Sequence, residues 1–242
     1  MPGPGPIGVA SVDSSKFPTA VVTGDKKAKG SLSITVRNDT NSDFNGPVTV
    51  SVLASTDITA DVDDVSLVQS DKRLKLKPGQ TKVLKFKPST ASLPAGAYTL
   101  LGAATVDSLT SAATGPALNV EAAFVHLVSG GAATPPKSPL AAGKKVTLSV
   151  PLRNDGNVAT SKTPATYTLI FSASADESGA VYQTTTTGKI SLKPQQSKPQ
   201  KVSFTLAAGA LGTGSYTVLV KLSAELNDTN GQIVVTIPVT VA

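Results

Sequence analysis

The feature that most constrains this chain is an internal repeat. Four sequence blocks recur in the same order in its two halves, at offsets of 116 to 119 residues: Leu32–Asn41 with Leu148–Asn157, Val48–Asp57 with Tyr167–Asp176, Leu74–Lys82 with Ile190–Lys198, and Gly96–Leu101 with Gly214–Leu219. Blocks that keep their order and spacing indicate a duplicated domain. We therefore predict two homologous domains, residues 7–122 and 123–242, in a chain of 242 residues.

The first six residues, Met1 to Pro6, alternate proline with glycine. This pattern is typical of a linker or a frayed terminus. We treat residues 1–6 as a Pro/Gly-rich terminal segment. We expect the chain to be a piece of a longer protein or a mature form.

Both halves show the alternation of apolar and polar residues that is typical of half-buried strands. The clearest runs of alternating apolar residues are Leu32, Ile34 and Val36; Val48, Val50 and Val52; and Val146, Leu148, Val150 and Leu152. Strands of five to eight residues recur about every ten residues, separated by turn residues. About seven such strands in each half predict an all-β protein made of two tandem immunoglobulin-like antiparallel β-sandwich domains.

Residues that recur at the strand ends have structural explanations. Asn38 and Asn154 lie in Arg-Asn-Asp turns, where asparagine tolerates a left-handed backbone and bonds to nearby backbone groups. Tyr98 and Tyr216 each follow a glycine at the start of a strand. We expect each ring to cover the core and each hydroxyl to reach the backbone, as in a tyrosine corner.

These motifs resemble those of the CARDB family, bacterial cell-adhesion-related domains with an immunoglobulin-like fold. The first copy carries VRNDT (36–40), LASTD (53–57), LKPG (76–79) and LPAGAYTL (93–100), and the second carries LRNDGN (152–157), KP (193–194) and GSYT (214–217). The second copy departs from the family pattern because it lacks a cluster of aspartates. The resemblance implies a spacer or adhesion module of a large bacterial surface or secreted protein.

Composition excludes several chemistries. The chain has no cysteine, so it has no disulfide and no thiolate metal site, and its single histidine, His126, rules out an all-histidine metal cage. No apolar run approaches the roughly 18 residues of a membrane span, so we expect no direct membrane insertion. We interpret His126 as a surface strand residue and predict no catalytic residues.

An acidic cluster in the first half is the one candidate metal site. Asp57, Asp61, Asp63 and Asp64 provide four carboxylates within eight residues, and calcium prefers oxygen ligands of this kind. The cluster lacks the glycine and the closing glutamate of an EF-hand loop. Two readings stay open, a calcium site and a solvated loop in which the aspartates cap turns.

A basic run follows the acidic cluster. It consists of Lys72, Arg73, Lys75, Lys77, Lys82, Lys85 and Lys87, with Leu74, Leu76 and Phe86 in between. Such a run is consistent with a surface for nucleic acid or anionic polysaccharide, or with lysines that keep strand edges from pairing with other chains. We expect Phe86 to face the core with the leucines, so no aromatic platform for base stacking accompanies these cations, and we expect no nucleic-acid partner.

Together these observations predict a non-enzymatic structural or adhesion module, serving as a stalk, spacer or assembly unit of an exported bacterial protein. We expect it at the cell surface or outside the cell, with a protein or cell-surface partner and no cofactor other than the candidate calcium. A variant of this hypothesis is self-assembly into a fibre through strands such as Ile7–Val12 or Ile233–Val241. The alternative is a carbohydrate- or protein-binding module that uses the loops at one end of a sandwich.

Overall fold

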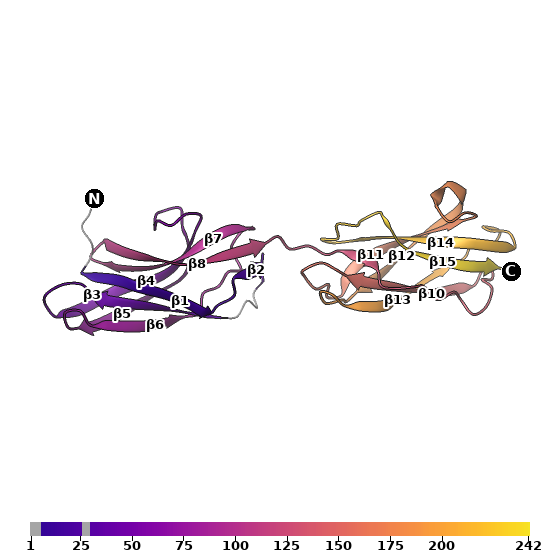
Figure 1. Cartoon of the computed structure of the whole chain (residues 1–242). Helices are drawn as coiled ribbons and strands as arrows, with labels where there is room; N and C mark the ends of the chain where they lie inside the picture. Colours follow the sequence, from indigo (N-terminus) through magenta and orange to yellow (C-terminus); the bar gives the residue numbers. More distant parts are fainter. Residues whose placement is uncertain (1–5, 26–29) are drawn as a thin grey trace. The chain divides into compact units, whose positions relative to one another are not determined.

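The computed structural model describes residues 6–25 and 30–242, and this part of the chain is almost entirely β-structure (Figure 1). The described residues contain no α-helix and one 3₁₀ turn, η1 (Glu177–Gly179). The prediction of an all-β protein is confirmed. The chain divides into two compact units between Ala122 and Ala123, and each unit has its own hydrophobic core.

Unit 1 contains two sheets. Its strands are β1 (Ile7–Lys16), β2 (Ala20–Val22), β3 (Ser31–Asn38), β4 (Phe44–Ser55), β5 (Val65–Leu76), β6 (Thr81–Phe86), β7 (Gly96–Val106) and β8 (Leu109–Glu121). One sheet has the order β1-β3-β6 and the other β2-β8-β7-β4-β5. All pairings are antiparallel except that of the short strand β2, which runs parallel to β8.

Unit 2 repeats this plan with a shorter first strand. Its strands are β9 (Leu127–Ser129), β10 (Lys145–Asn154), β11 (Thr163–Ser172), β12 (Ala180–Ile190), β13 (Ser197–Thr205), β14 (Gly214–Ala224) and β15 (Ile233–Val241). One sheet of unit 2 has the strand order β13-β10-β9, and the other has the order β12-β11-β14-β15. In place of β2, unit 2 has a parallel bridge between Leu140 and Val241, and a second parallel bridge joins Val125 to Asn227.

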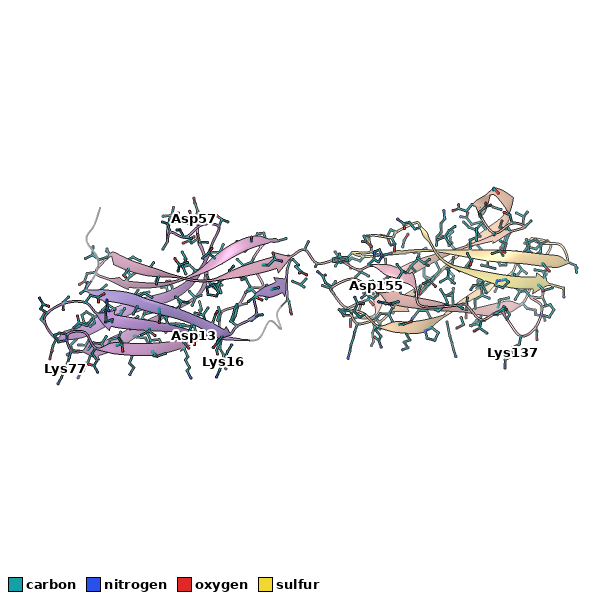
Figure 2. All side chains as sticks on the ribbon, viewed as in Figure 1. Asp13, Lys16, Asp57, Lys77, Lys137 and Asp155 are labelled. Atoms are coloured by element: carbon teal, nitrogen blue, oxygen red, sulfur yellow. The ribbon has the colours of Figure 1, made fainter. Side chains whose placement is uncertain are left out.

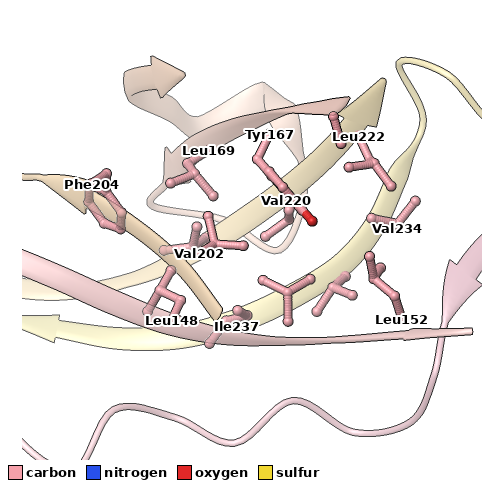
Figure 3. Close-up of a cluster of buried hydrophobic side chains, with 14 of the residues drawn as sticks. Leu148, Leu152, Tyr167, Leu169, Val202, Phe204, Val220, Leu222, Val234 and Ile237 are labelled. Carbon is pink, nitrogen blue, oxygen red and sulfur yellow. The ribbon is translucent and has the colours of Figure 1, made fainter. Parts of the chain in front are cut away.

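Alternation of side chains places one face of each sheet in a shared core. In unit 2, Leu148 and Leu152 of β10 meet residues of β11, β13, β14 and β15 (Figure 3). Phe171 and Phe204 pack edge to face with ring centroids 5.8 Å apart. Burial of these apolar side chains is the main force that holds the two sheets together, at about 25 cal/mol per Å² removed from water.

Several strands are longer than the predicted five to eight residues. β4 and β5 have twelve residues each and β8 has thirteen. Turn-forming residues lie inside these strands without ending them. Pro47 of β4 faces Arg73 of β5 at a point that the ladder with β7, which begins at Thr49, does not reach. Its missing N–H therefore interrupts no pairing on that side.

The two units differ where their first strand packs. In unit 1, β1 pairs with β3 from Ile7 to Lys16, and its Val12 approaches Gly102 and Gly115. A Cβ atom at either glycine would lie 2.7 to 2.8 Å from a methyl carbon of Val12. By strand pairing, unit 2 has Val220 in place of Gly102, and Ile237 in place of the bulge that contains Gly115. Both larger side chains are fully buried, and β9 has only three residues.

The structure corrects one alignment between the repeats. Val48–Asp57 and Tyr167–Asp176 match in sequence at an offset of 119, but the strand ladders make Ser55 equivalent to Ser172, an offset of 117. Ser55 pairs with Thr99, and Ser172 pairs with the equivalent Thr217. A shift of two residues preserves the inward and outward faces of a strand, so the hydrophobic pattern alone could not reveal the error.

Candidate functional site

The acidic cluster lies in the loop between β4 and β5, where its carboxylates cap backbone turns. Asp57 accepts hydrogen bonds from the backbone N–H and the hydroxyl of Thr59, at 2.7 and 2.8 Å. These two bonds are the main reason that the pKa of Asp57 lies below its usual value. Asp64 accepts the N–H of Asp61 at 3.0 Å, and Asp61 accepts that of Asp63 at 3.0 Å.

The calcium prediction for Asp57, Asp61, Asp63 and Asp64 finds no support in this geometry. Within residues 6–25 and 30–242, no three His, Cys, Asp or Glu side chains are placed to hold one metal ion. Three of the carboxylates, those of Asp57, Asp61 and Asp64, accept hydrogen bonds from backbone groups of the loop itself. The loop projects from unit 1 (Figure 2). The arrangement matches the other reading, a solvated loop with turn-capping aspartates.

The equivalent loop of unit 2 uses the same chemistry at a shifted position. Asp176 accepts bonds from the hydroxyls of Ser178 and Ser174 at 2.5 and 2.8 Å, and from the N–H of Ser178 at 3.0 Å. These bonds lower the pKa of Asp176. At the root of each loop lies a buried serine, Ser55 or Ser172, whose hydroxyl bonds to the carbonyl four residues ahead.

Asn38 and Asn154 are fully buried and hold the turns at the ends of β3 and β10. The Asn38 amide donates to the carbonyls of Ser42 and Leu76 at 2.8 and 3.0 Å, and its oxygen accepts the N–H and hydroxyl of Thr40. Asn154 donates to the Val158 carbonyl at 2.8 Å and accepts the N–H of Gly156 at 3.0 Å. A buried amide with its bonds made fixes the path of the chain around it.

Tyr98 and Tyr216 occupy equivalent positions near the starts of β7 and β14. The Tyr98 hydroxyl donates to the Pro94 carbonyl at 3.1 Å, and the Tyr216 hydroxyl donates to the Gly212 carbonyl at 3.0 Å. Each ring is half-buried and packs against the core of its unit. Both contacts span four residues back along the chain, as a tyrosine corner does.

A second polar cluster, which the sequence analysis missed, lies in unit 2. Asn227 accepts the N–H of Leu127 at 3.1 Å, and Thr229 donates to the Leu127 carbonyl at 2.8 Å. Asn230 bonds to both backbone groups of Ala224. In the sequence, the cluster corresponds to the polar run Asn227 to Asn230, which contains no apolar residue. This cluster ties the first strand of the unit to the loop between β14 and β15.

His126 lies beside this cluster and is half-exposed. Its Nδ1 lies 2.8 Å from Oδ1 of Asp228. Within the described residues, no hydrogen bond joins either side chain of this pair to a serine hydroxyl. A serine nucleophile needs such a bond to its histidine. The pair links the same two segments as Asn227 and Thr229.

The cations of the basic run lie along one side of unit 1. β5 and β6 are the edge strands of their sheets, they adjoin each other, and the turn at residues 77–80 connects them. All seven cations are exposed, whereas Leu74, Leu76 and Phe86 between them are buried. We call these seven residues, Lys72, Arg73, Lys75, Lys77, Lys82, Lys85 and Lys87, the basic edge of unit 1. No ion pair within the described residues involves any of them.

Unit 2 contains a groove of about 500 Å³. The segment from Pro135 to Pro139 forms one wall, and the start of β14 and the end of β15 form the other. Tyr216, Thr217 and Pro238 contribute to its lining. Nothing in the sequence indicates this groove, because it forms where residues 135–139 meet segments about 80 to 100 residues further along the chain.

Comparison with known proteins gives no family. No family model matches the chain, and no curated protein matches it. Among solved structures, red sea bream transglutaminase aligns with 98% of this chain and 31% of its own length, at 12% identity and a TM-score of 0.35. The C-terminal domain of wzt covers 49% of this chain at 18% identity and a TM-score of 0.32, aligning over 75% of its own length. A β-glucosidase from Listeria innocua covers 46% of this chain and 16% of its own, at 11% identity and a TM-score of 0.29.

Scores this low carry no argument about the fold or the activity of this chain. Less than a third of the transglutaminase is matched. The described residues also include no helix with the length and apolar character needed to cross a membrane.

Proposed function

We propose that this chain is a non-enzymatic structural or adhesion module, a stalk, spacer or assembly unit of an exported bacterial protein at the cell surface or outside the cell. The proposal includes two tandem immunoglobulin-like β-sandwiches of about seven strands, residues 7–122 and 123–242, which follow a terminal segment, residues 1–6. It also includes a relationship to the CARDB domains. Its partner is a protein or another component of a cell surface.

One observation carries the proposal. Residues that recur between the two halves serve the fold of each unit rather than converging on a reacting group. Asn38 and Asn154 fix equivalent strand ends, and Tyr98 and Tyr216 fix equivalent corners. A module that is used for its shape keeps such residues in every copy, whereas an enzyme also needs groups placed around a substrate.

The sheet orders support the immunoglobulin-like interpretation. Each unit pairs a three-stranded sheet with a larger one. In unit 1 the chain crosses between the sheets on either side of the short strand β2, and again after β3, β5 and β6. Unit 2 crosses at the equivalent points, after β10, β12 and β13. Crossings of this kind between two antiparallel sheets are typical of Greek-key sandwiches.

The surface location can be tested with antibodies raised against the purified chain. They should label intact cells of the source organism by immunogold electron microscopy, with no increase after permeabilisation. Labelling that requires permeabilisation would overturn the export proposal. Multiple-turnover activity of the purified chain that one substitution abolishes would overturn the non-enzymatic proposal.

Fibre formation through terminal strands is a variant of this proposal. β1 is paired with β3 along its length, so donating Ile7–Val12 to a neighbour requires it to leave its own sheet. β15 lies at the edge of its sheet and can accept a strand without such an exchange. Size-exclusion chromatography with electron microscopy would show filaments, whereas a monodisperse monomer over a wide concentration range would exclude the variant.

The groove of unit 2 favours a second candidate function, a carbohydrate- or protein-binding module that uses loops at one end. Its tyrosine and prolines provide apolar surface, and Lys137 and several hydroxyl groups provide polar contacts. Screening the chain on glycan and peptide arrays tests this candidate. Hits should disappear in Thr217→Trp, which fills the groove, and persist in Thr184→Trp on β12.

A further inference from the structure

We propose that the edge strands of both units form binding sites for an acidic polysaccharide, a linear sugar polymer with regularly spaced carboxylates. This inference names a partner class for the proposed adhesion role and rests on that role. Binding is measured on the purified chain, so it succeeds or fails independently of where the protein is located.

The basic edge of unit 1 has a counterpart in unit 2. By strand pairing, Arg73, Lys77, Lys82 and Lys85 are equivalent to Lys189, Lys193, Lys198 and Lys201. We call these four the basic edge of unit 2. They lie on or between β12 and β13, which are again adjoining edge strands and are joined by a bond from the Thr186 hydroxyl to the Ser203 carbonyl at 2.9 Å. All four are exposed.

The cations of both basic edges are free of ion pairs within the described residues and can bind an anionic ligand. Ion pairs within the described residues involve other cations: Arg37, His126, Arg153 and Lys221. Strands β6, β12 and β13 contain no acidic residue, and β5 contains only Asp71, which accepts the Thr49 hydroxyl at 2.7 Å. The acidic loop with Asp57 projects from another side of unit 1 than the turn with Lys77 (Figure 2). From neighbouring elements, Asp43 borders the same hollow as Lys75 and Lys77, and Asp13 borders one with Lys85, but neither carboxylate forms an ion pair with these lysines. Positive charge therefore still exceeds negative charge along each edge.

Protection against edge pairing explains only part of this pattern. A lysine within an edge strand blocks the addition of another chain, and Lys82 and Lys198 fit that role. Lys77 and Lys193 lie in the turns between the edge strands, outside any ladder, and Lys87 lies beyond the end of β6. Their presence extends the positive surface past the region that needs protection.

The geometry favours a polysaccharide over a nucleic acid. Residues two apart on a strand lie about 6.6 to 6.8 Å apart on the same face, so Arg73 and Lys75 of β5 repeat at a spacing suited to a charged linear polymer. Single-stranded nucleic acid also needs exposed rings for stacking. Phe86 and Phe204, on the edge strands, are only 5% and 7% exposed, and Tyr182 packs against Phe171.

The test uses the full chain and polygalacturonate as the probe, with neutral dextran and a thymidine oligonucleotide for comparison. The triple variant Lys75→Gln, Lys82→Gln, Lys85→Gln removes three charges from the edge. Its control, Lys144→Gln, Lys145→Gln, Lys162→Gln, removes three exposed charges that belong neither to a basic edge nor to the groove of unit 2. We expect the edge variant to weaken polygalacturonate binding at least about tenfold at low salt, and the control less than about twofold. Added salt should weaken wild-type binding steeply.

The matching Lys→Arg edge variant keeps the charge and should retain binding, which separates charge from folding and aggregation. The unit 2 variant Lys189→Gln, Lys198→Gln, Lys201→Gln provides a second test if the first variant aggregates. The proposal is overturned if wild-type chain does not bind polygalacturonate, or if the control loses as much affinity as the edge variants. Tighter binding of the oligonucleotide would assign the surface to nucleic acid instead.

Discussion

At the scale of single residues, the buried amides of Asn38 and Asn154 explain how each unit keeps its strand ends together. Asn38 joins the end of β3 to Ser42 just before β4 and to Leu76 at the end of β5. A hydrophobic side chain would leave these carbonyls without partners in a dry environment, where each costs about 1 to 3 kcal/mol. The polar residue is therefore the stable choice at a position that is completely buried.

Asn38→Ala should destabilise unit 1, and Asn154→Ala unit 2, by about 2 to 3 kcal/mol, because several buried groups lose their partners at once. Urea unfolding measures this as a lower midpoint with an unchanged slope. Asn45→Ala is a suitable control since Asn45 is exposed. A loss below about 0.5 kcal/mol for both buried asparagines would contradict the structural role assigned to them.

Tyr167 makes unit 2 sensitive to alkali. Burial raises its pKa to about 12, whereas an unfolded tyrosine titrates near 10. The folded state thus holds its proton more tightly, so the associated stability is present below pH 10 and is lost as the pH rises from 10 to 12, by up to about 3 kcal/mol. Urea unfolding of wild type and Tyr167→Phe at pH 8 and 11.5 should show a larger loss for wild type. Equal losses would argue against a buried neutral hydroxyl.

At the scale of elements, the turn between β7 and β8 contains residues that fit its backbone geometry less well than Asn-Gly would. Val106 pairs with Leu109, so Asp107 and Ser108 form a two-residue loop, and their φ angles are +49° and +70°. Two consecutive positive φ angles define a type I′ turn, for which Asn-Gly is the preferred sequence. Serine has no special tolerance of this region, so the present turn is strained.

The double variant Asp107→Asn, Ser108→Gly should stabilise unit 1 by about 1 kcal/mol, since glycine removes the steric cost of the left-handed region. Its urea midpoint should rise, and Ser108→Val, with a β-branched residue at the same position, should lower it. If the glycine variant were less stable than wild type, the turn would not adopt this geometry in solution.

Sequence reasoning captured the elements through alternation and recurring turn residues, which depend on local chemistry. It placed Leu32, Ile34 and Val36 on the apolar face of a half-buried strand, and all three are fully buried. It missed β2, which has three residues, and the contrast between Gly102 and Val220, whose consequence depends on the distant Val12. It also left open the direction in which the carboxylates around Asp57 point. The backbone conformation of the loop sets that direction, and the spacing of the aspartates in the sequence does not reveal it.

At the scale of the whole molecule, two separate cores predict two separable folding units. Residues 7–122 and 123–242, expressed individually, should each unfold cooperatively in urea with the midpoint that they have in the full chain. A fragment without a cooperative transition would show that the core of one unit is insufficient by itself. The Tyr167→Phe variant identifies which transition of the full chain belongs to unit 2.

The parallel pairing of β2 with β8 has a mechanical consequence. Tension applied along the chain pulls two parallel strands in opposite directions, so their hydrogen bonds are sheared together instead of opening one after another. Tension from the N-terminal side reaches these pairs after β1 or β9 has separated from its neighbour. Unit 1 then opposes the load with three residue pairs, Ala20 to Val22 against Asn119 to Glu121, and unit 2 with the bridge of Leu140 and Val241. In single-molecule stretching, unit 2 should therefore rupture first and at the lower force. Rupture of unit 1 before unit 2 would contradict this order.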